Sequence, residues 1–73
     1  MSASELETLM LSILERELGA PIGVEANMFE CGVESLALLA MIDDFEEACG
    51  IHVDIVMALE QRTVRDIVRS LEY

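Results

Sequence analysis

The sequence predicts an all-α fold: a small antiparallel four-helix bundle with three main helices, one short third helix and a long first loop. Three segments, residues 4–18, 35–49 and 63–71, repeat apolar residues at helical spacing. The segment richest in β-branched residues, 51–56, has no second strand to pair with, and a lone strand leaves its backbone unsatisfied. At 73 residues, we expect one domain spanning residues 1–73.

The first helix is predicted from a start signal, an apolar stripe and a stop signal. Ser4 and Glu7 have the spacing of a capping box, and Ser2 and Glu5 offer an alternative register. Gly19 follows the last apolar position, where glycine commonly ends a helix. The stripe consists of Leu6, Leu9, Met10, Ile13, Leu14 and Leu18.

Helical periodicity stops between residues 19 and 34. Loops of this length are usually functional or disordered. Several apolar residues argue against disorder, so we expect a packed connection that crosses the body of the protein, with a short helical turn around residues 27–30. These apolar residues are Ile22, Val24, Met28, Phe29 and Val33.

The second helix is predicted from Ser35 to about Cys49, with Gly50 ending it. Its inward stripe is Leu38, Met41, Ile42, Phe45, Ala48 and Cys49. A second strip, which the core does not need, is Leu36, Leu39, Ala40 and Asp43. Acids in the last turn of a helix oppose its dipole at about 0.3–1 kcal/mol each, so their presence suggests a use. The acids in this half of the helix are Asp43, Asp44, Glu46 and Glu47.

Two further helices complete the predicted fold. We expect residues 51–54 to be extended and a short buried helix to follow at residues 55–60, with Asp54 as its N-cap. Thr63 is the predicted N-cap of the last helix, and Asp66 has the spacing to close a capping box. The last apolar stripe is Val64, Ile67, Val68 and Leu71.

The charge balance excludes several classes of function. Fifteen acidic residues stand against four arginines and no lysine, which gives a formal net charge of −11. Binding to nucleic acid or to an anionic membrane requires a basic surface, so we expect neither. Ten acids and no arginine or lysine lie between Arg16 and Arg62. Such a one-sign surface is a feature of association with other molecules.

We expect neither a membrane-spanning helix nor a signal peptide. The longest uncharged apolar stretch, residues 35–42, is far short of the roughly 20 residues that span a bilayer. Acids at Glu5 and Glu7 do not fit the basic start of a signal peptide. Cys31 and Cys49 are expected to be free thiols, which indicates a cytoplasmic protein.

Catalytic and metal sites are not indicated. Cys49 and His52 have the spacing of half a metal site, but two cysteines and one histidine in all are too few for a zinc site. Cys31 has no basic neighbour to activate its thiol. We therefore expect no metal and no enzymatic activity from this chain alone.

The junction between the long loop and the second helix carries a motif, Gly32-Val33-Glu34-Ser35-Leu36. A serine at a helix start is often only an N-cap. A helix N-terminus is also a favourable place for a phosphate group, because its free amides and dipole attract anions. From Phe29 to Val53, the sequence resembles the attachment region of acyl carrier proteins, whose usual motif is Gly-x-Asp-Ser-Leu. The order of helices extends this resemblance over the whole chain.

The resemblance implies that Ser35 carries 4′-phosphopantetheine, derived from coenzyme A, through a phosphodiester. Three features depart from the family pattern: Glu34 replaces the usual Asp, Ala37 and Ala40 replace residues that are often polar, and Cys49 replaces a common Phe. The substitution at Glu34 is expected to slow or narrow recognition by a phosphopantetheinyl transferase. Together the departures suggest a specialised pathway.

The implied function is that of a monomeric carrier in fatty acid, polyketide or related biosynthesis. It would hold acyl intermediates as thioesters and present them to loading and processing enzymes that have basic docking patches. An aminoacyl or peptidyl carrier, and an unmodified acidic interaction module, remain alternatives. The expected docking surface consists of Glu34, Leu36, Leu39, Ala40, Asp43, Glu46 and Glu47.

Overall fold

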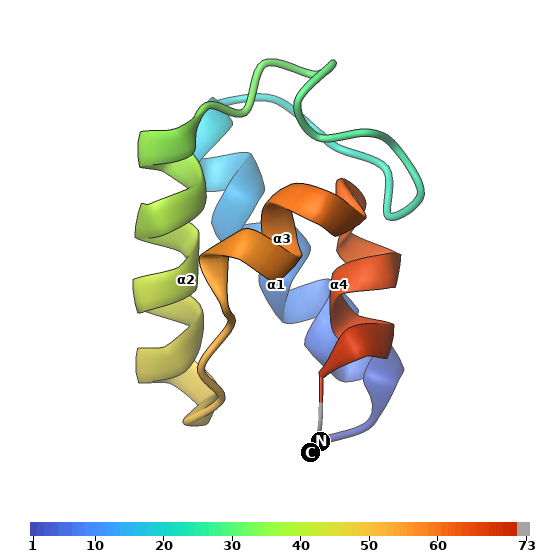
Figure 1. The fold of residues 1–73 in the computed structure, drawn as a ribbon, viewed down its shortest axis with the longest axis vertical. Helices are drawn as coiled ribbons and strands as arrows, with labels where there is room; N and C mark the ends of the chain where they lie inside the picture. Colours follow the sequence, from blue (N-terminus) through green and yellow to red (C-terminus); the bar gives the residue numbers. More distant parts are fainter. Residues whose placement is uncertain (72–73) are drawn as a thin grey trace.

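The computed structural model describes residues 1–71, which form four helices and no strand (Figure 1). The helices are α1 (Ala3–Leu18), α2 (Ser35–Cys49), α3 (Ile55–Gln61) and α4 (Val64–Ser70). The long helix α1 packs against both α2 and α4, and α3 contacts α2 and α4. The predicted all-helical class and the small bundle are confirmed.

The start of α1 corrects the preferred capping register. Ser2 Oγ accepts a hydrogen bond from the Glu5 amide at 3.2 Å, and Glu5 Oε1 accepts one from the Ser2 amide at 3.1 Å. The capping box is therefore the alternative, Ser2 with Glu5, and these bonds lower the pKa of the Glu5 carboxyl. The prediction of Ser4 with Glu7 was wrong because the helix already begins at Ala3, which places Ser4 inside it, and the Glu7 carboxylate lies against Arg65 of α4.

The core is aliphatic and methionine-rich, and it draws on all four helices and the loop. Phe45 is its one fully buried aromatic residue in the described part of the chain. The predicted stripes are largely confirmed, but Ala48 is exposed. At that end of α2 the inward positions belong to Phe45 and to Cys49, whose thiol donates to the Phe45 carbonyl. The buried residues are Leu6, Met10, Ile13, Leu14, Ile22, Met28, Val33, Leu38, Met41, Ile42, Phe45, Val53, Ala58, Val64, Ile67 and Val68.

The connection from Gly19 to Glu34 crosses one end of the bundle, above the helices in Figure 1. Three of its apolar residues, Ile22, Met28 and Val33, are buried in the core, as expected for a packed connection. The short helical turn expected around residues 27–30 is present as hydrogen-bonded turns over residues 28–32, which do not continue into a longer helix. Asn27 Oδ1 accepts the amides of Phe29 at 3.0 Å and Glu30 at 3.3 Å, as an N-cap does, and the Cys31 amide donates to the Asn27 carbonyl at 3.2 Å.

Backbone hydrogen bonds attach this loop to the far end of the sequence. The Met28 amide donates to the Arg62 carbonyl at 3.0 Å, and the Arg65 amide donates to the Val24 carbonyl at 3.0 Å. The loop therefore packs on the junction between α3 and α4, and its exit towards α2 starts from an anchored turn.

The short helix α3 begins as predicted but is less buried than expected. Asp54 Oδ1 accepts from the Met57 amide at 3.0 Å and caps the helix. Ala58 is its one fully buried residue, whereas Val56 and Leu59 are 58% and 41% exposed. Seven residues make only two turns, so a single narrow face can reach the core.

The start of α4 keeps half of the predicted capping box. Thr63 Oγ1 accepts from the Asp66 amide at 3.1 Å, as expected. The reciprocal bond is absent because the Thr63 amide donates to the Gln61 carbonyl at 2.9 Å. That tight turn is centred on Arg62, which ends α3 in the left-handed conformation with φ of 68°.

Candidate functional site

Ser35 is the first residue of α2 and is exposed. The N-cap position belongs to Glu34, whose extended backbone has φ of −104° and ψ of 171°. The helix therefore begins at Ser35, as predicted, and the alternative that this serine is only an N-cap is excluded because Glu34 holds that position. No hydrogen bond within residues 1–71 engages the Ser35 hydroxyl, which leaves it available for chemistry.

The first turn of α2 offers amide groups that its own cap does not satisfy. Glu34 makes no side-chain hydrogen bond to the helix, and the first backbone bond runs from the Leu38 amide to the Glu34 carbonyl at 2.9 Å. The amides of the three residues before Leu38 have no acceptor in the described part of the chain. Free amides and the helix dipole together favour an anion at this point.

Two buried side chains fix the position of this helix start. Val33 lies just before the N-cap and Leu38 lies one turn into the helix, and both are in the core. The Val33 amide donates to the Met28 carbonyl at 3.0 Å, and Gly32 turns the chain with φ of 104°. Because the core holds the backbone on both sides of Ser35, the serine lies at the surface of an anchored element.

The predicted docking residues lie on the solvent side of α2. Leu36 is 80% exposed and Leu39 is 45% exposed, although both are large apolar residues, and Ala40 is partly buried. A single exposed leucine is common on a protein surface. Leu36 and Leu39, however, lie one helical turn apart and close to the Ser35 hydroxyl, so together they form an apolar patch. The remaining predicted residues, all exposed, are Glu34, Asp43, Glu46 and Glu47.

One acid of this surface has a partner that the sequence did not indicate. His52 Nδ1 lies 2.6 Å from Glu46 Oε1, and both side chains are largely exposed. The contact forms because Gly50 reverses the chain after α2 with φ of 77°, which returns residue 52 alongside the last turns of that helix. The sequence does not predict this pair, because the direction that the chain takes after Gly50 decides whether His52 returns to Glu46.

The residues considered as candidates for a catalytic or metal site do not come together in the structure. Cys31 is exposed on the loop, whereas Cys49 is partly buried at the end of α2. Within residues 1–71 no three His, Cys, Asp or Glu side chains are grouped to hold a metal ion. Searched over the same residues, no helix has the length and apolar character needed to cross a membrane.

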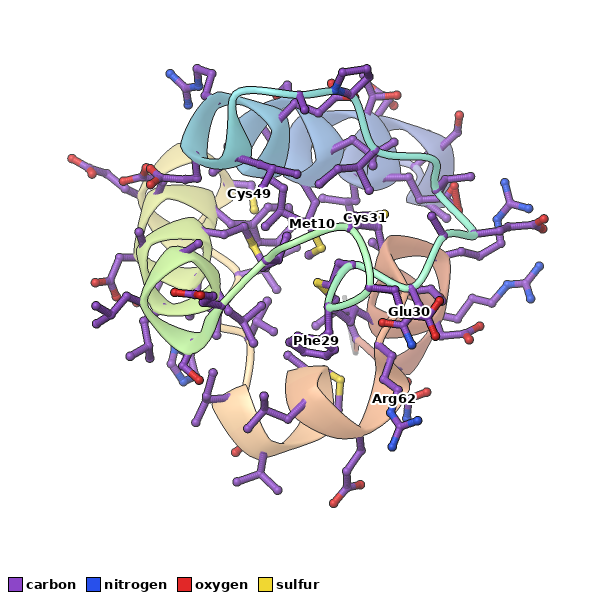
Figure 2. The ribbon with its side chains drawn as sticks, turned by 90° about the horizontal axis from the view of Figure 1, so that it is seen from above. Met10, Phe29, Glu30, Cys31, Cys49 and Arg62 are labelled. Carbon is purple, nitrogen blue, oxygen red and sulfur yellow. The ribbon has the colours of Figure 1, made fainter. Side chains whose placement is uncertain are left out.

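A hollow beneath the loop was also missed by the sequence analysis. It has a volume of about 440 Å³ and is lined by Asn27, Phe29, Glu30, Leu59 and Arg62. Figure 2 shows Phe29 turned inward between the loop and α3, with Glu30 and Arg62 towards the periphery. Arg62, which lines this hollow, has a left-handed backbone conformation. That conformation could not be predicted from the sequence, because glycine or asparagine usually occupies such a position.

Comparison with protein families identifies the chain. The model of the phosphopantetheine attachment site family matches residues 6–71, which is nearly the whole described chain. The protein belongs to this family, as the resemblance to acyl carrier proteins predicted. Searches of curated proteins and of solved structures give no significant match.

The family is one of carrier domains, not catalytic ones, and its members hold 4′-phosphopantetheine covalently. Membership also implies interaction with a phosphopantetheinyl transferase and with biosynthetic enzymes. The residues of this chain fit such a group, because an exposed primary hydroxyl stands beside amides that favour a phosphate. The carboxylate of Glu34, next to Ser35 in the chain, opposes an anion at this point.

Proposed function

We propose that Ser35 Oγ is the attachment point of the 4′-phosphopantetheine arm. The observation that carries this proposal is the exposed, unengaged hydroxyl at the first position of α2, within a chain of the phosphopantetheine attachment family. In the transfer, Ser35 loses its proton, its oxygen bonds to the phosphorus next to pantetheine in coenzyme A, and adenosine bisphosphate leaves. The free amides of the first helical turn then favour the bound phosphodiester.

The proposed role is that of a small antiparallel helical carrier of acyl groups in fatty acid, polyketide or related biosynthesis. The arm, when bound, supplies a thiol that holds the acyl group as a thioester. This chain contributes a fixed attachment point and a recognition surface, and it performs no reaction itself. The strongly acidic composition, with net charge −11, favours a discrete acyl carrier over an aminoacyl carrier. We propose a cytoplasmic monomer, consistent with the free thiols.

The proposed recognition surface lies on α2 next to Ser35. Asp43, Glu46 and Glu47 are three and four residues apart and so share one helix face. The exposed Leu36 and Leu39 continue this face towards Ser35, with Glu34 at its edge and Ala40 between the leucines and the acids. An apolar centre with an acidic rim suits enzymes that present a hydrophobic cleft surrounded by Arg and Lys.

Intact mass spectrometry tests the attachment. The protein is incubated with coenzyme A and a transferase of broad specificity, and the wild type is expected to gain the mass of one phosphopantetheine. Ser35→Ala is expected to gain none while keeping its helical circular dichroism, because the Ser35 side chain caps no helix. Modification of the alanine variant would assign the arm to another residue.

The same preparation separates the alternatives. A chain that folds but is never modified would be an unmodified acidic interaction module. For a modified chain, loading by acyl-transferring or by amino-acid-activating enzymes distinguishes acyl from aminoacyl cargo, with the formation of thioester measured by mass.

A further inference from the structure

A second hollow lies directly beside the proposed attachment point, between the end of α1 and the start of α2. Its volume is about 340 Å³ and it opens to solvent. Both chain neighbours of Ser35, Glu34 and Leu36, line it. The remaining lining residues come from the end of α1, the loop and the first turn of α2: Glu17, Leu18, Gly32 and Ala37.

A glycine keeps the wall of this hollow clear. Gly32 has φ of 104°, a conformation that other residues rarely adopt. A Cβ atom at this position would stand 3.4 Å from Leu18 Cδ1, so it would occupy the space between the loop and the end of α1. The lack of a side chain at Gly32 therefore leaves Leu18 accessible as an apolar wall.

The lining has two chemical characters. Leu18, Leu36 and Ala37 provide apolar surface, and the exposed carboxylates of Glu17 and Glu34 provide hydrogen-bond acceptors without donors. A ligand that fits combines an apolar group with hydrogen-bond donors, since the two carboxylates would repel an anion. The part of a pantetheine arm next to its phosphate has this combination: a geminal dimethyl group, a hydroxyl and amide N–H groups.

We infer that this hollow, lined by Glu17, Leu18, Gly32, Glu34, Leu36 and Ala37, holds the part of the arm next to the phosphate when the carrier is not engaged by an enzyme. The inference rests on the proposed attachment at Ser35, which lies between two of the lining residues. The geminal dimethyl group packs on Leu18 and Ala37, and the hydroxyl and the first amide N–H donate to Glu17 and Glu34. The phosphodiester stays at Ser35, outside the carboxylate-lined space.

Nuclear magnetic resonance of the apo and modified proteins tests this placement. Amides close to Ser35 change on modification in any case, so Glu17 and Leu18 of α1 are the informative probes because they lie far from Ser35 in the sequence. We expect their amide signals to shift on modification, and we expect nuclear Overhauser contacts between the geminal methyls of the arm and the δ-methyls of Leu18. Shifts at Phe29 and Leu59 instead would place the arm in the hollow beneath the loop, and no shift beyond α2 would leave it in solvent. Either result would overturn the inference.

Variants separate this result from failure of the attachment itself. Ala37→Leu adds bulk to the hollow, and Glu17→Gln removes one acceptor charge while keeping the side-chain shape. We expect the arm-to-Leu18 contacts to be lost in the first and weakened in the second, while the mass gain persists in both. Glu60→Gln on α3 is the matched control and is expected to retain the contacts. Unchanged contacts in both hollow variants would contradict the inference alone, whereas absence of the mass gain in the wild type would overturn it together with the proposed function.

Discussion

Arg65 on α4 lies 3.4 Å, Nε to Oε1, from Glu7 on α1, a residue 58 positions earlier in the chain. The same guanidinium contacts Glu25 on the loop through Nη1. Although desolvation opposes the charge of Arg65, its hydrogen bonds and Coulombic attraction to these two carboxylates raise its pKa. One cation therefore ties together two helices and the loop that leads to Ser35.

Loss of this tie is expected to destabilise the protein more than loss of another arginine on the same helix. Arg65→Gln leaves Glu7, which is partly buried, without its cation, and it frees the loop at Glu25. Arg69→Gln removes an exposed charge of α4 that makes no ion pair in residues 1–71. Thermal unfolding should show a clearly lower Tm for Arg65→Gln than for Arg69→Gln. Equal Tm values would show that the contacts of Arg65 with Glu7 and Glu25 contribute nothing to stability beyond their effect on net charge.

The capping register of α1 gives a second prediction. Ser2→Ala removes the side chain that accepts the Glu5 amide and is expected to lower the free energy of unfolding by about 1 kcal/mol. Ser4→Ala is the matched control, because Ser4 is already inside the helix and its side chain caps nothing. It is expected to change stability little. Urea titration of both variants measures the difference, and a larger loss in Ser4→Ala would restore the register first expected from the sequence.

The same capping box makes a small contribution to the pH dependence of stability. The pKa of Glu5 is lowered in the folded protein by its hydrogen bonds to Ser2, so the folded state favours the carboxylate. The stabilisation is complete above the pKa of the unfolded chain and is lost as the pH falls through the lower folded value. Glu5→Gln should therefore flatten the decrease in Tm on acidification below about pH 5. An identical slope in both proteins would remove Glu5 from this account.

Much of the fold was predictable because local signals and burial agree. The bounds of α2, the Gly19 and Gly50 ends and the Asp54 cap follow from spacing and capping chemistry alone. The misplaced capping box has a different cause, since Ser4 with Glu7 and Ser2 with Glu5 are equivalent as local patterns. In the structure the helix begins at Ala3, so Ser4 lies inside it, and Glu7 contacts Arg65, a long-range partner that no local rule contains.

The position of the candidate site in the chain could be predicted from the sequence, but its hydrogen bonding and the shape of its surroundings could not. The glycine motif and the following apolar periodicity located Ser35 at a helix start. They did not reveal that Glu34 is the N-cap without a capping bond, which leaves the first amides free. The hollows beside and beneath the loop depend on how the loop packs on Leu18 and Arg62, and tertiary packing of this kind leaves no spacing pattern in a sequence.

Repulsion among the acids predicts a response to salt. Ten acids lie between Arg16 and Arg62 without an arginine or lysine, and the compact state brings them closer together than the unfolded chain does. The Tm is expected to rise with moderate NaCl, and with millimolar Mg²⁺ or Ca²⁺. A variant with Asp43→Asn and Glu47→Gln is expected to show a smaller rise, because part of the repulsion is already removed. A melting curve that is independent of both salts would contradict the expectation.

The acidic face of α2 gives a prediction about association rates. Replacement of Glu46 and Glu47 by Lys removes acids from the unfavourable end of the helix dipole, so folding should be unaffected or improved. The variant should nevertheless associate more slowly with the transferase, mostly through a lower on-rate, and with a weaker salt dependence than the wild type. Stopped-flow measurements over a salt series provide the comparison.

Single reversals supply the control for this experiment. Glu47→Lys and Glu60→Lys change the net charge equally, but Glu60 is exposed on α3 and does not belong to the proposed face of α2. We expect the larger loss of on-rate from Glu47→Lys. Equal rates for both variants would mean that net charge, and not this helix face, guides the transferase.

Localisation of the arm by peptide mass tests the central claim most directly. Ser35 is the only serine or threonine between Arg16 and Arg62, and the chain has no lysine, so trypsin releases residues 17–62 as one fragment with a single hydroxyl of this type. After incubation with coenzyme A and a transferase, this fragment should carry one phosphopantetheine, and fragment-ion masses should place it on Ser35. A fragment 17–62 of unmodified mass, or the same mass gain on a fragment outside this range, would contradict the assignment of Ser35 as the carrier residue.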